Sequence, residues 1–178
     1  GGNSAEPGSI FKIKMDGTSY TTLHKFSVYK DGAPVGALVQ GLDGTLYGTA
    51  IGDGSNTPSG FGNIFKINPN GTGYQILHFF KGSNGATPRG DLTLRGNKLF
   101  GFTANGGVNN SGVIFAYDLS ASSDKKLYDV NDRVTGANPF AGRMIVVDAP
   151  NPEANFIVQP ANNTFYVPLT QNVTANLV

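Results

Sequence analysis

Two histidines are the residues of this sequence with the clearest capacity for chemistry. His24 and His78 occur in the related segments YTTLHKF and YQILHFF, so they fall at the same place in two successive units. A repeated imidazole could form a ring of metal ligands or of binding groups. Zinc requires further clustered ligands, and the third related segment has Tyr128 at this place. Repetition therefore favours a structural role, in which each histidine forms hydrogen bonds within its own sheet.

An oxygen-rich loop, DGSN at residues 53–56, could bind Ca²⁺. It lacks the D-x-[DN]-x-[DN]-G spacing and the bidentate glutamate of a calcium loop. The equivalent loop at residues 105–110 contains no carboxylate. We therefore predict solvated turns, with no metal and no cofactor.

Nothing in the sequence resembles a catalytic centre. Glu6 and Glu153 are the only glutamates, and no acid/base pair for glycoside hydrolysis is identifiable. A G-x-S-x-G elbow is absent, and so is cysteine, which excludes disulfides, thiolate zinc sites and a cysteine nucleophile. The chain is predicted not to be an enzyme, and its catalytic residues are predicted to be none.

Three tyrosines are candidates for stacking on sugars. Tyr20 and Tyr74 occupy repeated positions, which favours packing at sheet edges, whereas Tyr29 lies in a loop and is expected to be more open. The Lys125–Lys126 pair is interpreted as a solvated strand end.

Composition restricts the class of protein that must hold these residues. Of 178 residues, 25 are glycine, 39% are hydrophobic and only 14% are charged, which favours many short strands joined by tight turns. The net charge of +1 comes from scattered residues, so a nucleic-acid partner is not expected. No apolar run reaches the ~20 residues of a membrane span.

Internal repetition is the strongest signal. GSIFKI, GNIFKI and GVIFAY begin at Gly8, Gly62 and Gly112, in steps of 54 and 50 residues. A period near 50 with four short apolar segments predicts one four-stranded antiparallel sheet per unit, the size of a β-propeller blade. The fold class is therefore predicted to be all-β. The strands are expected at residues 9–14, 21–27, 36–40, 45–50, 63–67, 74–80, 91–95, 98–103, 113–117, 126–130 and 143–147.

The repeated residues have structural explanations without any ligand. Asp16-Gly17, Asp43-Gly44 and Asn70-Gly71 suit hairpin turns, and Pro34, Pro88 and Pro139 are expected in the turns before the inner strands. Gly48 and Gly101 are expected to let neighbouring backbones approach. Two sets of equivalent buried positions are predicted, namely Phe11, Phe65 and Phe115, and Leu38, Leu92 and Met144.

The units resemble the GloVer tandem repeat of bacterial surface proteins with varied C-terminal anchors. The resemblance rests on GNIFKINPNGTGYQILHFF, GAPVGALVQGLDGTLYGTA and GANPFAG, and it covers about Gly1 to Val147. It implies a propeller-like array, a secreted or cell-surface location in bacteria, and no catalytic motif.

The expected domains are a propeller-like repeat region at residues 1–149 and a tail at 150–178. The first region divides into a partial blade (1–31), two blades (32–83 and 84–134) and the opening strand of another (135–149). The tail is interpreted either as the start of a sandwich domain or as a strand donor to another subunit. Two blades cannot close a ring, so we expect either a piece of a longer protein or an assembling subunit, for example of a filament.

The leading functional hypothesis is a non-catalytic extracellular or cell-surface protein with a role in structure or adhesion. One alternative is a propeller that binds carbohydrate or protein, and another is a non-catalytic part of a larger secreted enzyme. The expected partners are copies of the chain itself or further repeats, with a glycan or a surface protein as alternatives.

Overall fold

The computed structural model describes residues 7–27, 29–52, 60–131, 139, 142–146, 156–159 and 165–167. Every regular element among them is a β-strand, which confirms the all-β prediction. The strands are β1 (Ser9–Lys12), β2 (Thr21–Lys25), β3 (Ala33–Gln40), β4 (Leu46–Ile51), β5 (Asn63–Ile67), β6 (Gln75–Phe79), β7 (Ala86–Pro88), β8 (Thr93–Arg95), β9 (Lys98–Asn105), β10 (Val113–Asp118), β11 (Ser123–Asp129), β12 (Arg143–Val146), β13 (Phe156–Gln159) and β14 (Phe165–Val167).

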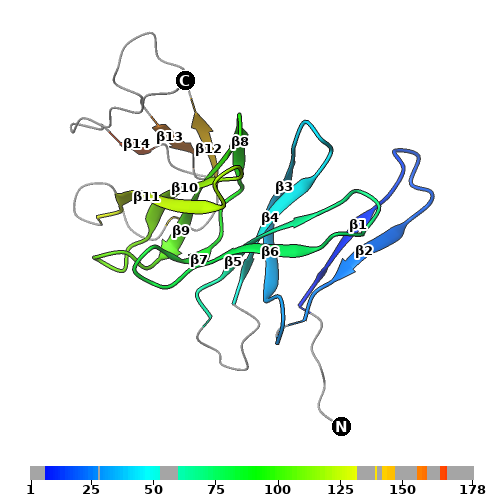
Figure 1. The fold of residues 1–178 in the computed structure, drawn as a ribbon, viewed down its shortest axis with the longest axis horizontal. Coiled ribbons are helices and arrows are strands. Elements are labelled where there is room, and N and C mark those ends of the chain that lie inside the picture. The colour runs from blue at the N-terminus through cyan, green and yellow to red at the C-terminus, as the bar shows by residue number, and fades with distance from the viewer. Residues whose placement is uncertain are drawn as a thin grey trace.

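The strands form antiparallel sheets that follow one another along the chain (Figure 1). The first sheet is β1-β2 and the second is β3-β4-β5-β6. In the third sheet β7 and β8 both pair with β9, which is followed by β10 and β11; the fourth is β12-β13-β14. Within each sheet most strands that are consecutive in sequence pair with each other, so hairpins make most of the connections within sheets.

The first strand of each full sheet is less regular than predicted. β3 begins at Ala33 rather than Gly36, and its pairing with β4 shifts register in the middle. Gly36 has a φ of 69°, a left-handed conformation that interrupts a regular ladder. At the equivalent Gly90, the space for a side chain is taken by the ring of Phe102. The strand predicted at residues 91–95 is corrected to β8 at Thr93–Arg95, and β7 at Ala86–Pro88 precedes it without having been predicted.

Three hairpins have the same type of turn. Asp16, Asp43 and Asn70 each accept hydrogen bonds of 2.7–3.0 Å from the N–H and hydroxyl of the threonine two residues later. The glycine between them has a φ of 81°, 85° or 89°, as in a type I turn followed by a left-handed glycine. The Thr18 hydroxyl thereby lowers the pKa of Asp16, and the N–H of Thr45 that of Asp43.

A β-bulge recurs at one position of the unit. The register between the third and fourth strands shifts immediately after Ile10, Ile64 and Ile114. These positions are 54 and 50 residues apart, so the units are structurally equivalent although their length varies.

The core lies between successive sheets and depends on a phenylalanine packed over a glycine. Phe65 pairs with Gly48 across the β4–β5 ladder, and Phe115 pairs with Gly101 across β9–β10. A Cβ on either glycine would lie 2.6 Å from the tip of that ring. Both rings are 1% exposed. The glycines therefore make room for a side chain, and not for a neighbouring backbone as the sequence suggested.

The predicted burial is wrong for the first member of each set. Phe11 and Leu38 are 54% and 38% exposed, whereas Leu92 and Met144 are 3% and 0% exposed. Among the described residues β1 pairs with β2 alone, so no second strand lies beside Phe11. In the described part of the chain Leu38 also has no counterpart of Tyr47, which lies in the same hydrophobic cluster as Leu92.

The strands beyond Val147 continue the fourth sheet within this chain. β13 pairs with β12, and β14 pairs with β13. The inner edge of this sheet contacts the preceding one, since the Asp91 N–H donates to the Gly142 carbonyl at 2.9 Å and the Thr93 hydroxyl donates to the Met144 carbonyl. The domain limits near residues 149 and 150 and the strand-donor role of the tail stay predictions.

The unequal burial of equivalent phenylalanines gives a first test. Phe65→Ala should lower the free energy of unfolding by about 3–5 kcal/mol, because it empties a closed site between two sheets. Phe11→Ala should lower it by less than about half of that, because its ring already contacts solvent. Urea denaturation of the two variants measures the difference, and equal losses would contradict this account of the core.

Candidate functional site

The two histidines occupy structurally equivalent positions. His24 pairs with Ile10 and His78 with Ile64, in both cases immediately before the bulge. Tyr128 stands at the corresponding place in the third sheet, opposite Ile114. The sequence-based equivalence of these positions is therefore present in the strand register.

His24 contacts groups outside its own sheet. Its Nε2 lies 3.4 Å from an Asp31 carboxylate oxygen in the connection to the next sheet. Its ring stacks on Tyr74, with ring centroids 3.8 Å apart and planes 9° apart. Tyr74 precedes β6 of the second sheet, so this stacking joins the first sheet to the second.

His78 makes the corresponding contacts with polar partners. The Asn84 amide donates to His78 Nε2 at 3.2 Å and to an Asp124 carboxylate oxygen at 2.9 Å. His78 Nδ1 lies 3.6 Å from the other Asp124 oxygen. This arrangement suits a neutral imidazole with its proton on Nδ1, and burial lowers the pKa of His78 although the charge of Asp124 opposes the shift.

The partners of the two histidines also correspond. Asp31 and Asn84 both precede a Gly-Ala pair at the start of the next sheet. Tyr74 and Asp124 are equivalent, because each lies two residues before the residue that pairs with the bulge phenylalanine. Each histidine thus lies on the last strand of one sheet. It contacts the segment that leads to the next sheet and a residue at the start of that sheet's last strand. The hydrogen bonds expected within one sheet instead join neighbouring sheets, and the Asx residue six or seven positions later was the sequence signal for this contact.

The oxygen-rich loops are occupied by local hydrogen bonds where they are described. In the β9–β10 loop, the Asn110 side chain accepts from the Gly106 N–H at 2.9 Å, and Asp129 accepts from the Val108 N–H at 2.9 Å. Within the described ranges no three His, Cys, Asp or Glu residues are grouped to hold a metal ion. Residues 53–56 lie outside the described part, as do Glu6 and Glu153.

The tyrosines and lysines fall into different environments. Tyr20 and Tyr29 are exposed, while Tyr74 is half-buried and burial, with the nearby charge of Asp31, raises its pKa. Lys125 is exposed, but Lys126 forms an ion pair of 2.7 Å with Asp129.

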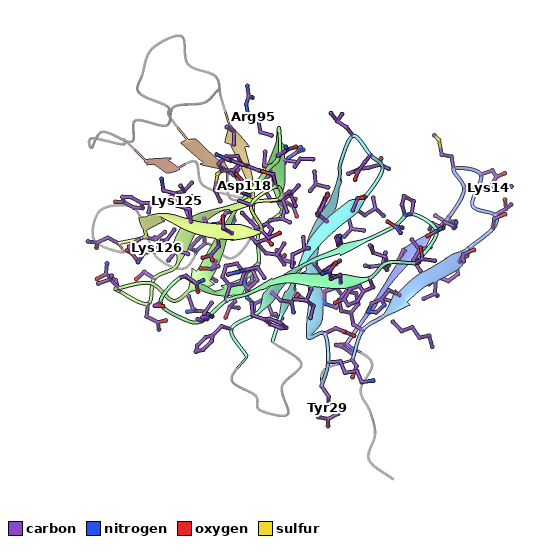
Figure 2. All side chains as sticks on the ribbon, viewed as in Figure 1. Lys14, Tyr29, Arg95, Asp118, Lys125 and Lys126 are labelled. Atoms are coloured by element: carbon purple, nitrogen blue, oxygen red, sulfur yellow. The ribbon has the colours of Figure 1, made fainter. Side chains whose placement is uncertain are left out.

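Exposed apolar side chains gather on the connections between the sheets' second and third strands. Phe61 and Val108 are exposed in two such segments, β4–β5 and β9–β10, and Tyr29 is exposed in the connection that leads from β2 to β3 of the next sheet. A Cβ on Gly82 would lie 3.2 Å from the Phe61 ring, and the Gly82 carbonyl accepts a hydrogen bond from the Gly107 N–H at 2.8 Å. We call the surface of Tyr29, Phe61 and Val108 the loop face; Figure 2 shows Tyr29 at the end of the sheets opposite to Lys14 and Arg95.

Comparison with known proteins identifies the repeat. A family model described as the Gloeobacter/Verrucomicrobia repeat matches residues 1–176. The chain belongs to this repeat family. The match confirms the resemblance found in the sequence and extends past Val147 into the tail.

Structural comparison gives the architecture of the Gloeobacter/Verrucomicrobia repeat chain. A chain of the "Crystal structure of Nidogen/Laminin Complex" is similar, with a TM-score of 0.55 and 20% identity. That neighbour is a β-propeller, so the successive sheets are propeller-type blades. The alignment covers 85% of this chain and 47% of the neighbour, so this chain spans about half of its length.

Two further comparisons concern function and membranes. No curated protein matches the chain. In the residues that the structure describes, no helix is long and apolar enough to cross a membrane.

The buried histidine predicts a dependence of stability on pH. The pKa of folded His78 lies below its ordinary value of 6.5, so the unfolded chain binds the proton first. Its stabilising contribution is therefore complete above 6.5 and is lost as the pH falls from 6.5 through the folded value. Unfolding free energies measured between about pH 8 and about pH 5 should decrease over this range, and His78→Gln should flatten the curve.

An NMR titration separates the effects of burial and of Asp124 on the pKa of His78. Asp124→Asn should lower the pKa of His78 further, because it removes the carboxylate that opposes the effect of burial. His78→Gln assigns the resonance, since the chain has only two histidines. A pKa of His78 at or above 6.5 would refute this description of its environment.

Proposed function

We propose that this chain is a non-catalytic module of a secreted or cell-surface bacterial protein, with a role in structure or adhesion. The observation that supports it most directly is the use made of the repeated residues. His24 and His78, which have the clearest chemical capacity, both link neighbouring blades. Phe65 and Phe115 fill the same kind of site between blades. The residues that repeat along the chain thus stabilise the packing of one blade on the next, and the outer surfaces of the blades remain for binding.

Labelling of bacteria that produce the protein tests this proposal. An antibody against residues 60–131 should label intact cells or the culture medium, and permeabilisation should add little signal. A cytoplasmic protein labelled in parallel provides the control. Signal that appears only after permeabilisation would overturn the proposed location. The non-catalytic role would be overturned by an enzymatic activity of the purified chain that His24→Gln or His78→Gln abolishes without unfolding the protein.

A second candidate is a binding propeller that recognises a protein or a glycan through the loop face. The similar propeller belongs to the crystal structure of a nidogen/laminin complex. The loop face of this chain carries exposed aromatic and aliphatic side chains, with Phe61 and Tyr29 44% and 55% exposed. Aromatic residues of this kind supply much of the contact energy in protein and sugar recognition.

Screening on glycan and extracellular-protein arrays tests the second candidate. For any ligand found, Phe61→Ala should weaken binding by about tenfold or more if Phe61 acts as an anchor. Met15→Ala is the matched control, because Met15 is fully exposed in the β1–β2 turn, and its neighbour Lys14 lies at the end of the sheets opposite to Tyr29 (Figure 2). Equal effects of the two substitutions would place the binding site elsewhere.

A further inference from the structure

We propose that the open edge of β1 binds the inner β-hairpin of another unit of this repeat, through a strand that places a glycine opposite Phe11. The inference rests on the proposed non-catalytic function and names a partner for it. The partner is defined by chemistry: a two-stranded hairpin whose second strand reads Leu-aromatic-Gly, as in LYG at residues 46–48 and LFG at residues 99–101.

The backbone of β1 has one edge that no described strand covers. Its counterparts β5 and β10 each lie between two strands, β4 and β6 in one sheet and β9 and β11 in the next. Among the described residues β1 pairs with β2 alone (Figure 1). An extended strand can add to such an edge through main-chain hydrogen bonds.

The side chains along this edge are those that the other sheets bury. Phe11 and Ile13 are 54% and 51% exposed. Their counterparts in the second and third sheets are at most 2% exposed, namely Phe65, Ile67, Phe115 and Tyr117. The Phe11 ring instead lies against exposed Tyr20, with centroids 5.1 Å apart.

The edge of β1 accepts only certain strands, because the Phe11 ring needs space on the strand that pairs with it. In both complete blades the ring lies over a glycine of the paired strand, and any Cβ there would come within 2.6 Å of it. By the same register, the residue opposite Phe11 must be glycine. The aromatic residue before that glycine would then stand near Leu38, as Tyr47 stands in one cluster with Leu92. Leu38 is 38% exposed without it.

A second copy of this chain does not offer a suitable strand among its described residues. Its two Leu-aromatic-Gly strands, β4 and β9, already have partners on both edges. In the fourth sheet Val158 pairs with Met144, the counterpart of Leu92. Valine therefore occupies in β13 the position that glycine occupies in β9, and β13 does not meet the requirement at Phe11.

A synthetic hairpin with the sequence of residues 32–51 tests the proposal on the full chain. Hydrogen–deuterium exchange at the amides of Ser9–Lys12 should slow in a saturable manner when this peptide is added. The matched peptide carrying Gly48→Val should protect these amides at least about tenfold less well at equal concentration, because its Cβ would meet the Phe11 ring. Equal protection by both peptides would overturn the glycine requirement.

A fused form covers the case in which the free hairpin does not fold, since isolated hairpins are marginally stable. The same segment joined ahead of Gly1 by a flexible linker should raise the Tm of the chain. Its Gly48→Val form should raise the Tm less, and Phe11→Ala should become more destabilising in the fused chain than in the original one. No protection by the peptide together with no gain in Tm on fusion would refute the proposal.

Light scattering distinguishes the competing occupant. Self-association that protects the amides of β1 without any peptide would show that a second copy occupies the edge, and would refute the proposal. Failure of these experiments would leave surface labelling unaffected, so the failure of this inference and that of the proposed function can be told apart.

Discussion

The packing of one phenylalanine ring over one glycine is the interaction on which the rest of the structure depends. Phe65 over Gly48 and Phe115 over Gly101 lie at the centre of the two complete blades. The glycine removes the Cβ that would hold the ring away from the sheet, and the ring can then be covered by the preceding sheet. Burial of these rings supplies apolar area at each interface, while the strand ladders satisfy the backbone polar groups.

The blade interfaces combine this constant apolar contact with a variable polar one. The first histidine stacks on Tyr74, and the second pairs with Asp124 through Asn84. Both arrangements connect the same three places in consecutive blades. The repeat therefore tolerates different chemistry at this point, provided that the last strand remains attached to the connection that follows it.

Much of this architecture could be predicted from local patterns. The Asx-Gly-Thr turns were predictable because each depends on a left-handed glycine and on hydrogen bonds within three residues. The unit of four strands followed from its spacing. The contact between Gly90 and the ring of Phe102, close to the break between β7 and β8, was not predictable, because Phe102 lies on another strand.

What the sequence by itself determined is the unit: its strands, its turns and its family. Only the tertiary structure decided what each copy of the unit contacts. Phe11 and Phe65 occupy equivalent places in nearly identical segments, yet one is half exposed and the other fully buried. The partners of His24 and His78 likewise lie in the next sheet. The physical reason is that hydrogen bonds in a turn depend on adjacent residues, whereas burial depends on which strands and sheets lie alongside.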